Sequence, residues 1–150
     1  MQDLDEAIAL DRETLSFLPK GHPDRSALLS NLALHLSSRY NQLGEMRDLN
    51  EAIVLNRDAL NLRPQGHPCR SISLSNLAEA LSTRYNRLQV IQELDEAIVL
   101  DGEALSIRPQ GHPERSRSLE NLACHLRSRF AWSKQPQDEG DLFSLYAQRM

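Results

Sequence analysis

The sequence predicts an all-α fold in which a pair of helices is repeated along the chain. Gly21, Gly66 and Gly111 are each 45 residues apart, and a fixed period of about 20 to 50 residues is typical of helical-repeat arrays. Aromatic residues make up only 5% of the chain while Leu and Ala are frequent, which favours helix over strand. Apolar residues also recur at intervals of three and four. We therefore expect about seven antiparallel helices and no strand.

The repeat covers most of the chain and is not confined to one motif. The segment "RPQGHPCRS" begins at Arg63 and "RPQGHPERS" begins at Arg108, while a looser copy, "LPKGHPDRS", begins at Leu18. When residues 46–90 are aligned with 91–135, about half of the positions are identical, which indicates internal duplication. We predict one repeat domain, 1–150, with these parts: an unpaired second helix at 1–18, unit 1 at 19–63, unit 2 at 64–108 and unit 3 at 109–150.

Each unit should contain two amphipathic helices. In the middle unit Leu74, Leu77 and Leu81 share one face of the first helix, and Pro68 suits its first helical position because its φ is fixed and it lacks an N–H. The second helix ends before Pro109, whose ring disfavours helical geometry at the preceding residue. The predicted helices are 2–18, 23–42, 47–62, 68–87, 92–107, 113–131 and 139–149. The predicted core contains Leu32, Leu36, Ile53, Leu77, Leu81, Ile98 and Leu122.

A histidine follows the repeated glycine in each copy, at His22, His67 and His112. Imidazole is a common metal ligand and general base. Equivalent residues of successive helix pairs lie on the order of 10 Å apart, however, which is too far for one ion with bonds near 2 Å. No Asp or Cys is repeated beside the histidines. We interpret the segment as a helix stop, a turn and a helix start, and we predict no metal site and no cofactor.

The second helix of the unit and its exit resemble the tetratricopeptide repeat (TPR) family. Ala52, Ala59 and Pro64 match that family's small residue, second small residue and proline, as do Ala97, Ala104 and Pro109; Ala7, Thr14 and Pro19 match less well. The TPR period is about 34 residues, so this repeat is an extended form. The text "GHPDRSALLSNLALHL" is similar to kinesin light chain repeats and to fungal TPR arrays associated with caspase-like CHAT peptidase or nucleotide-binding domains. The resemblance implies a TPR-like right-handed superhelix of antiparallel helix hairpins.

Both ends of the array depart from the repeat. Residues 1–18 form a second helix without its first helix, and residues 139–149 are interpreted as a degenerate capping helix in the third unit. A terminal repeat helix with no partner leaves an apolar face uncovered. A homo-oligomer would therefore form through these exposed terminal helices.

Composition and motifs exclude several functional classes. The net charge is −4 with both signs interspersed, so no basic face favours nucleic acid. No stretch approaches the roughly 20 apolar residues of a membrane span, and the acidic N-terminus is unlike a secretory signal, so we expect a cytoplasmic protein without membrane contact. No phosphate loop, nucleophile motif or zinc motif is present, and we predict no catalytic residues and no enzyme activity.

The leading hypothesis is a non-catalytic protein–protein interaction scaffold that binds a peptide or protein partner in a concave groove. The alternative is a regulatory or sensor region of a larger enzyme or signalling protein, such as a caspase-like peptidase or an NTPase, whose catalytic domain lies elsewhere. Assays of hydrolase activity on the chain would separate catalysis from scaffolding. RNA binding would need stacking aromatics and a basic groove, and the sequence offers neither.

The groove residues are inferred from the TPR resemblance. Asn31, Asn76 and Asn121 each precede the Leu-Ala pair of a first helix, where the TPR family turns a side chain toward its groove. An amide there can donate to and accept from an extended peptide backbone, although a bond to a neighbouring helix is an equal alternative. The lysine of carboxylate-clamp TPRs is absent, which disfavours a terminal carboxylate ligand. The other candidates are Ser30, Ser75, Glu79, Glu120, Arg117 and Arg127.

Overall fold

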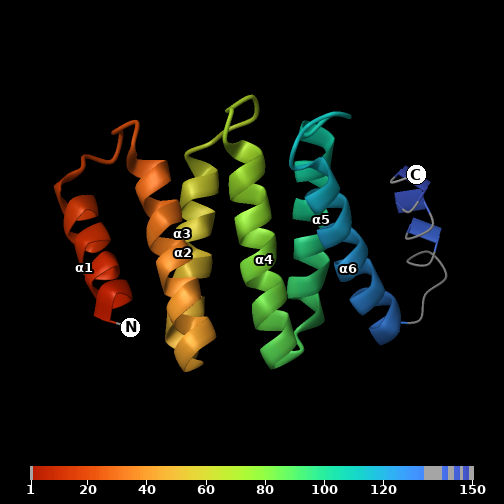
Figure 1. The fold of residues 1–150 in the computed structure, drawn as a ribbon, viewed down its shortest axis with the longest axis horizontal. Helices are drawn as coiled ribbons and strands as arrows, with labels where there is room; N and C mark the ends of the chain where they lie inside the picture. Colours follow the sequence, from red (N-terminus) through yellow and green to blue (C-terminus); the bar gives the residue numbers. More distant parts are fainter. Residues whose placement is uncertain (1, 134–139, 142–143, 146, 149–150) are drawn as a thin grey trace. The chain divides into compact units, whose positions relative to one another are not determined.

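The computed structural model describes residues 2–133, 140–141, 144–145 and 147–148, and in these ranges it contains six α-helices and no strand (Figure 1). The helices are α1 (Gln2–Phe17), α2 (Arg25–Leu43), α3 (Met46–Asn61), α4 (Arg70–Leu88), α5 (Ile91–Ile107) and α6 (Arg115–Ser133). The all-α prediction is confirmed. Of the predicted capping helix at 139–149, residues 140–141, 144–145 and 147–148 are described and are helical, and the others lie outside the described residues. None of the helices in the described ranges is long and apolar enough to cross a membrane.

The first helices of the units begin two residues later than predicted. Pro68 was expected at the first helical position, but α4 begins at Arg70, because residues 67–70 form a turn in which the Arg70 N–H donates to the His67 carbonyl at 3.1 Å. The same bond, at 3.1 and 3.0 Å, precedes α2 and α6. Gly66 and Gly111 have φ values of 90° and 88°, a conformation that favours glycine. The glycine and the proline therefore both lie in the turn.

The described residues divide into two compact units, residues 1–80 and 81–150. In the first unit α2 packs against both α1 and α3. The cluster between these helices contains Ile8, Leu32, Ala33, Leu36 and Ala52. Small residues at Ala33 and Ala52 let the helices approach closely, as the TPR resemblance implies.

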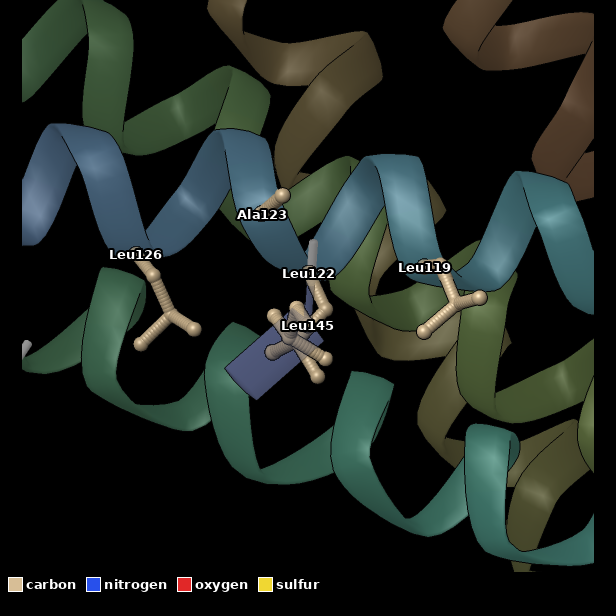
Figure 2. Close-up of a cluster of buried hydrophobic side chains, with 5 residues drawn as sticks. All are labelled: Leu119, Leu122, Ala123, Leu126 and Leu145. Atoms are coloured by element: carbon tan, nitrogen blue, oxygen red, sulfur yellow. The ribbon is translucent and has the colours of Figure 1, made fainter. Parts of the chain in front are cut away.

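In the second unit α5 packs against α6. The buried cluster contains Leu119, Leu122, Ala123, Leu126 and Leu145. Figure 2 shows the three α6 leucines directed from their helix toward α5, with Leu145 of the C-terminal segment among them. Leu145 is thus a core residue. It lies 45 residues after Leu100 of α5 and so holds the same repeat position.

Six of the seven predicted core residues are buried and one is not. Leu32, Leu36, Ile53, Leu77, Leu81 and Leu122 are buried. Ile98 is only half-buried, and it packs against the buried cluster of the second unit. It lines a pocket beside Gly102, where no side chain on that residue covers it. The apolar period places Ile98 on the correct face but cannot report how well that face is covered.

The turn between the two helices of a hairpin uses a left-handed residue. Gly44 ends α2 with φ 73°, and its N–H donates to the Tyr40 carbonyl at 2.7 Å. Gln89, 45 residues later, has φ 59° and donates to the Tyr85 carbonyl at the same distance. The backbone geometry of the turn is therefore kept although the second unit has no glycine there.

Candidate functional site

The repeated histidines stabilise the turn that precedes each first helix. The Nδ1 atom of His67 accepts a hydrogen bond from the Cys69 backbone N–H at 3.0 Å, and His22 and His112 make the same bond at 3.1 Å. The bond leaves Nδ1 occupied within its own turn. Among the described residues, no group of three or more His, Cys, Asp or Glu side chains is placed to hold a metal ion. The interpretation as a structural joint accounts for this geometry.

Buried arginines fasten the same turn to the helices around it. Arg70 donates to the carbonyl of Arg63 at 2.8 Å, and the buried guanidinium of Arg63 donates to the Ser73 and Ser26 hydroxyls at 2.8 and 3.2 Å. In the next copy Arg115 donates to the Arg108 carbonyl, and Arg108 donates to Ser118 at 2.6 Å; burial lowers the pKa of the Arg108 guanidinium. The buried guanidinium groups of Arg63 and Arg108 serve the joint and are unavailable as surface contacts.

Two His–Asp pairs connect neighbouring helices and were missed by the sequence analysis. His35 of α2 bonds Asp11 of α1 at 2.6 Å, and His125 of α6 bonds Asp101 of α5. The two pairs are 90 residues apart in the sequence, and each spans 24 residues. The 24-residue spacing shared by the two pairs is the sequence signal from which they could have been predicted. Each carboxylate orients an imidazole between two helices, which is a structural arrangement.

The three asparagines proposed for partner binding lie at the surface of successive first helices. Asn31 is exposed on α2, Asn76 is half-buried on α4, and Asn121 is half-buried on α6. Within the part of the chain that the structure describes, no hydrogen bond is made by these three side chains. Their amides therefore retain donors and acceptors that a peptide backbone could use.

The other candidate residues differ in how far they reach the surface. Ser30 is buried, so it cannot contact another protein directly. Its hydroxyl has no hydrogen-bond partner among the described residues. Ser75 is half-buried and Glu79 is exposed on α4. The candidates on α6, which are Glu120, Arg117 and Arg127, are all exposed. A guanidinium nitrogen of Arg117 lies 3.8 Å from a carboxylate oxygen of Glu114. The α6 face therefore carries mixed charge.

Apolar side chains accompany the asparagines on the first two of these helices. Leu34 on α2 and Ile72 on α4 are each about half exposed, and both lie at helical spacing from an asparagine. Cys124 occupies the corresponding place on α6 and is exposed. Leu10 and Phe17 are also exposed, on α1, where self-association stays a prediction. The asparagine faces thus combine apolar contact area with unused amide groups.

The fold and these repeated joints define a TPR-like helical-repeat protein. Its structure is similar to a crystal structure from Podosopora anserina described as a kinesin light chain with nearly identical TPR-like repeats. The TM-score is 0.62, with 22% sequence identity over 98% of this chain and 69% of that chain. No protein-family model matches the sequence, and no curated protein matches it. The structural likeness confirms the TPR-like fold.

Proposed function

We propose that the chain is a non-catalytic scaffold that binds extended segments of partner proteins through its asparagine faces, those of α2 and α4 in the first unit and that of α6 in the second. The observation that carries this proposal is the recurrence of Asn31, Asn76 and Asn121 at one repeat position, each at or near the surface and without a hydrogen bond to described residues. A structural asparagine would be expected to bond a neighbouring helix. Amides that can both donate and accept suit a peptide main chain.

The chemistry of the faces limits the partner segment. Leu34 and Ile72 expose apolar area in the first unit, whereas Arg117 and Arg127 belong to a charged face on α6. A segment bound at the first unit would be matched by apolar residues, and a segment bound at α6 by mixed charge. Exposed apolar side chains among polar ones are typical of protein-binding surfaces.

Substitution of Asn76 tests the proposal. Peptides of 12 random residues would first be selected on the immobilised chain, and a selected peptide would then be titrated calorimetrically. Asn76→Ala should weaken binding by about 1–3 kcal/mol, because the peptide group that it bonds would be left unsatisfied. Asn86→Ala, which changes an exposed asparagine elsewhere on α4, is the control and should leave the affinity unchanged. Equal affinity for both variants would show that the asparagine face is not the binding surface.

The scaffold could also be the regulatory or sensor region of a larger enzyme or signalling protein. The same face would then bind a segment of that protein. We expect the chain itself to hydrolyse neither peptides nor nucleoside triphosphates, as measured with fluorogenic peptides and by phosphate release.

A further inference from the structure

An arginine–carboxylate pair joins two successive second helices, α1 and α3, but is incomplete in the last copy of the repeat. Arg12 of α1 lies 2.7 Å from Glu51 of α3, and the two residues are 39 positions apart. The same repeat positions hold Arg57 and Glu96 in the sequence of the next copy. In the last copy they hold Gly102 and Asp141. The acid is therefore retained where the arginine has been replaced by glycine.

The packing of α5 does not require a glycine at position 102. Gly102 lies inside α5 and its φ is an ordinary negative value. A Cβ atom built on it would meet nothing within 4 Å. Glycine in a helix interior is disfavoured relative to alanine because it loses more conformational freedom on folding. The residue leaves open space without enabling a turn or a close helix approach.

That space is a pocket of about 270 Å³ whose walls are mostly apolar. Ile98 lines it from α5, and Leu122 and Leu126 line it from α6; Figure 2 shows the two leucines directed toward α5. The C-terminal segment contributes the described residues Asp141, Ser144 and Leu145. An aliphatic wall with one carboxylate matches a side chain that is apolar along its stem and cationic at its end.

The equivalent residues of the first unit are more completely buried. Ile8, Leu32 and Leu36 correspond to Ile98, Leu122 and Leu126, and they are at most 2% exposed. Ile98 is half-buried instead. This greater exposure of Ile98 accompanies a change at the neighbouring repeat position, which is arginine at position 12 and glycine at position 102.

We propose that the pocket beside Gly102 and Asp141 binds an arginine side chain supplied by a partner protein. The methylene groups of that arginine would pack on the leucines, and its guanidinium would pair with Asp141 as Arg12 pairs with Glu51. Guanidinium suits the site better than ammonium because it is less strongly hydrated and can bond a carboxylate through two parallel N–H groups. None of the three asparagines is among the described residues that line the pocket, so this inference stands or fails independently of the peptide-binding proposal.

The affinity for single amino-acid derivatives tests this inference directly. Nα-acetyl-L-arginine methylamide would be titrated into the ¹⁵N-labelled chain while amide chemical shifts are recorded. Saturable shifts are expected at Ile98, Gly102 and Asp141. The citrulline derivative has nearly the same shape without the charge and should bind at least tenfold more weakly, and the lysine derivative should fall between them. Shifts that do not saturate, or equal affinity for arginine and citrulline, would overturn the proposal.

Three variants locate the binding to this pocket. Gly102→Arg supplies the arginine from within the chain and should abolish binding of the derivative. Gly102→Ala leaves most of the pocket open and should keep the affinity within about twofold. Asp141→Asn changes an exposed carboxylate, is compatible with folding, and should weaken binding at least tenfold. Circular dichroism would verify that each variant is folded. Unchanged affinity in folded Gly102→Arg or in Asp141→Asn would contradict the assignment.

Discussion

The two compact units place residues from the same repeat positions in cores of different tightness. Leu36 in residues 1–80 is fully buried, whereas its counterpart Leu126 in residues 81–150 is 5% exposed and borders a pocket. Both leucines lie on the same face of a first helix, so the period of the sequence treats them alike. Gly102 lines the same pocket, and a Cβ atom on it would meet nothing within 4 Å. Burial in a repeat protein therefore depends on every residue that covers the periodic face.

The His–Asp pairs show the same principle in polar contacts. The side chains of His35 and Asp11 are partly exposed in the first unit, whereas those of His125 and Asp101 are 10% and 3% exposed in the second. The intervening repeat positions hold Asn56 and Ala80, so both members of the pair are replaced together. The replacement leaves a neutral amide at the position of the acid, and Asn56 is buried with its Oδ1 atom unpartnered among the described residues.

Truncation of the two equivalent leucines should give the largest effects. Leu36→Ala is expected to cost about 4–5 kcal/mol of unfolding free energy, because it opens a cavity in a closed cluster. Leu126→Ala should cost about 2–3 kcal/mol, because part of its surroundings is already open. Urea denaturation monitored by circular dichroism measures both values. Leu34→Ala, at an exposed position on α2, should change stability by less than about 0.5 kcal/mol. Equal costs at Leu36 and Leu126 would show that the pocket closes in solution.

A double-mutant cycle should show that Asp101 and His125 act as one unit. His125→Ala alone should cost about 3 kcal/mol, because it removes the partner of the buried Asp101 carboxyl. The double variant Asp101→Asn, His125→Ala copies Asn56 and Ala80 and should recover about 1–2 kcal/mol of that loss. Thermal and urea unfolding measure the cycle. The same cycle at the more exposed pair of the first unit should give a smaller coupling, and the reverse order would contradict the role of burial.

The helices and most of the core could be predicted because they depend on spacing within one unit. Leu77 and Leu81 recur at helical intervals, and both are buried. The exposure of Ile98 could not be predicted in this way, since it depends on Gly102 one turn further along α5. Helix starts were misplaced by two residues because Pro68 is equally compatible with a turn and with a first helical position.

The candidate site was predicted in part. The surface positions of the asparagines were inferred from the TPR resemblance, and these side chains are exposed or half-buried. Ser30 was included as a neighbour of Asn31, but consecutive helix residues point 100° apart, and Ser30 is buried. The His35–Asp11 contact joins residues 24 positions apart and is lost in the middle repeat, so the repeat alignment did not reveal it. Whether the asparagines bind a peptide stays a prediction.

Acid should lower the stability of the first unit by protonating Asp48, which is paired with Arg39. Arg39 donates to both oxygens of the 1% exposed Asp48, at 2.7 and 2.8 Å, and these hydrogen bonds lower the pKa of Asp48. A carboxyl with a lowered folded-state pKa stabilises the protein fully above its unfolded value, near ~3.9. The contribution is lost as the pH falls below that value and through the lower folded-state pKa.

The variant Asp48→Asn should isolate this contribution. It is expected to cost about 2 kcal/mol at pH 7 and to make stability less dependent on pH below about pH 4. Glu93 is the corresponding acid in the second unit, but one of its oxygens is buried without a partner among the described residues. Glu93→Gln should therefore cost less. Urea midpoints between about pH 2 and pH 7 measure both variants, and parallel pH profiles for wild type and Asp48→Asn would contradict the assignment.

The smallest expected effect concerns the turn at which Gly44 and Gln89 are equivalent. Both residues adopt positive φ, which costs a residue with a Cβ about 1–2 kcal/mol relative to glycine. Gln89 offsets part of that cost, since its amide nitrogen lies 3.3 Å from the carbonyls of Tyr85 and Asn86. Glycine would also make the unfolded chain more flexible. Gln89→Gly should therefore stabilise the protein by only about 0.5–1 kcal/mol, as measured by urea denaturation. Gly44→Gln should destabilise it by about the same amount. A loss of stability in Gln89→Gly would mean that the two side-chain hydrogen bonds outweigh the backbone strain, and the first unit would then gain from a glutamine at position 44.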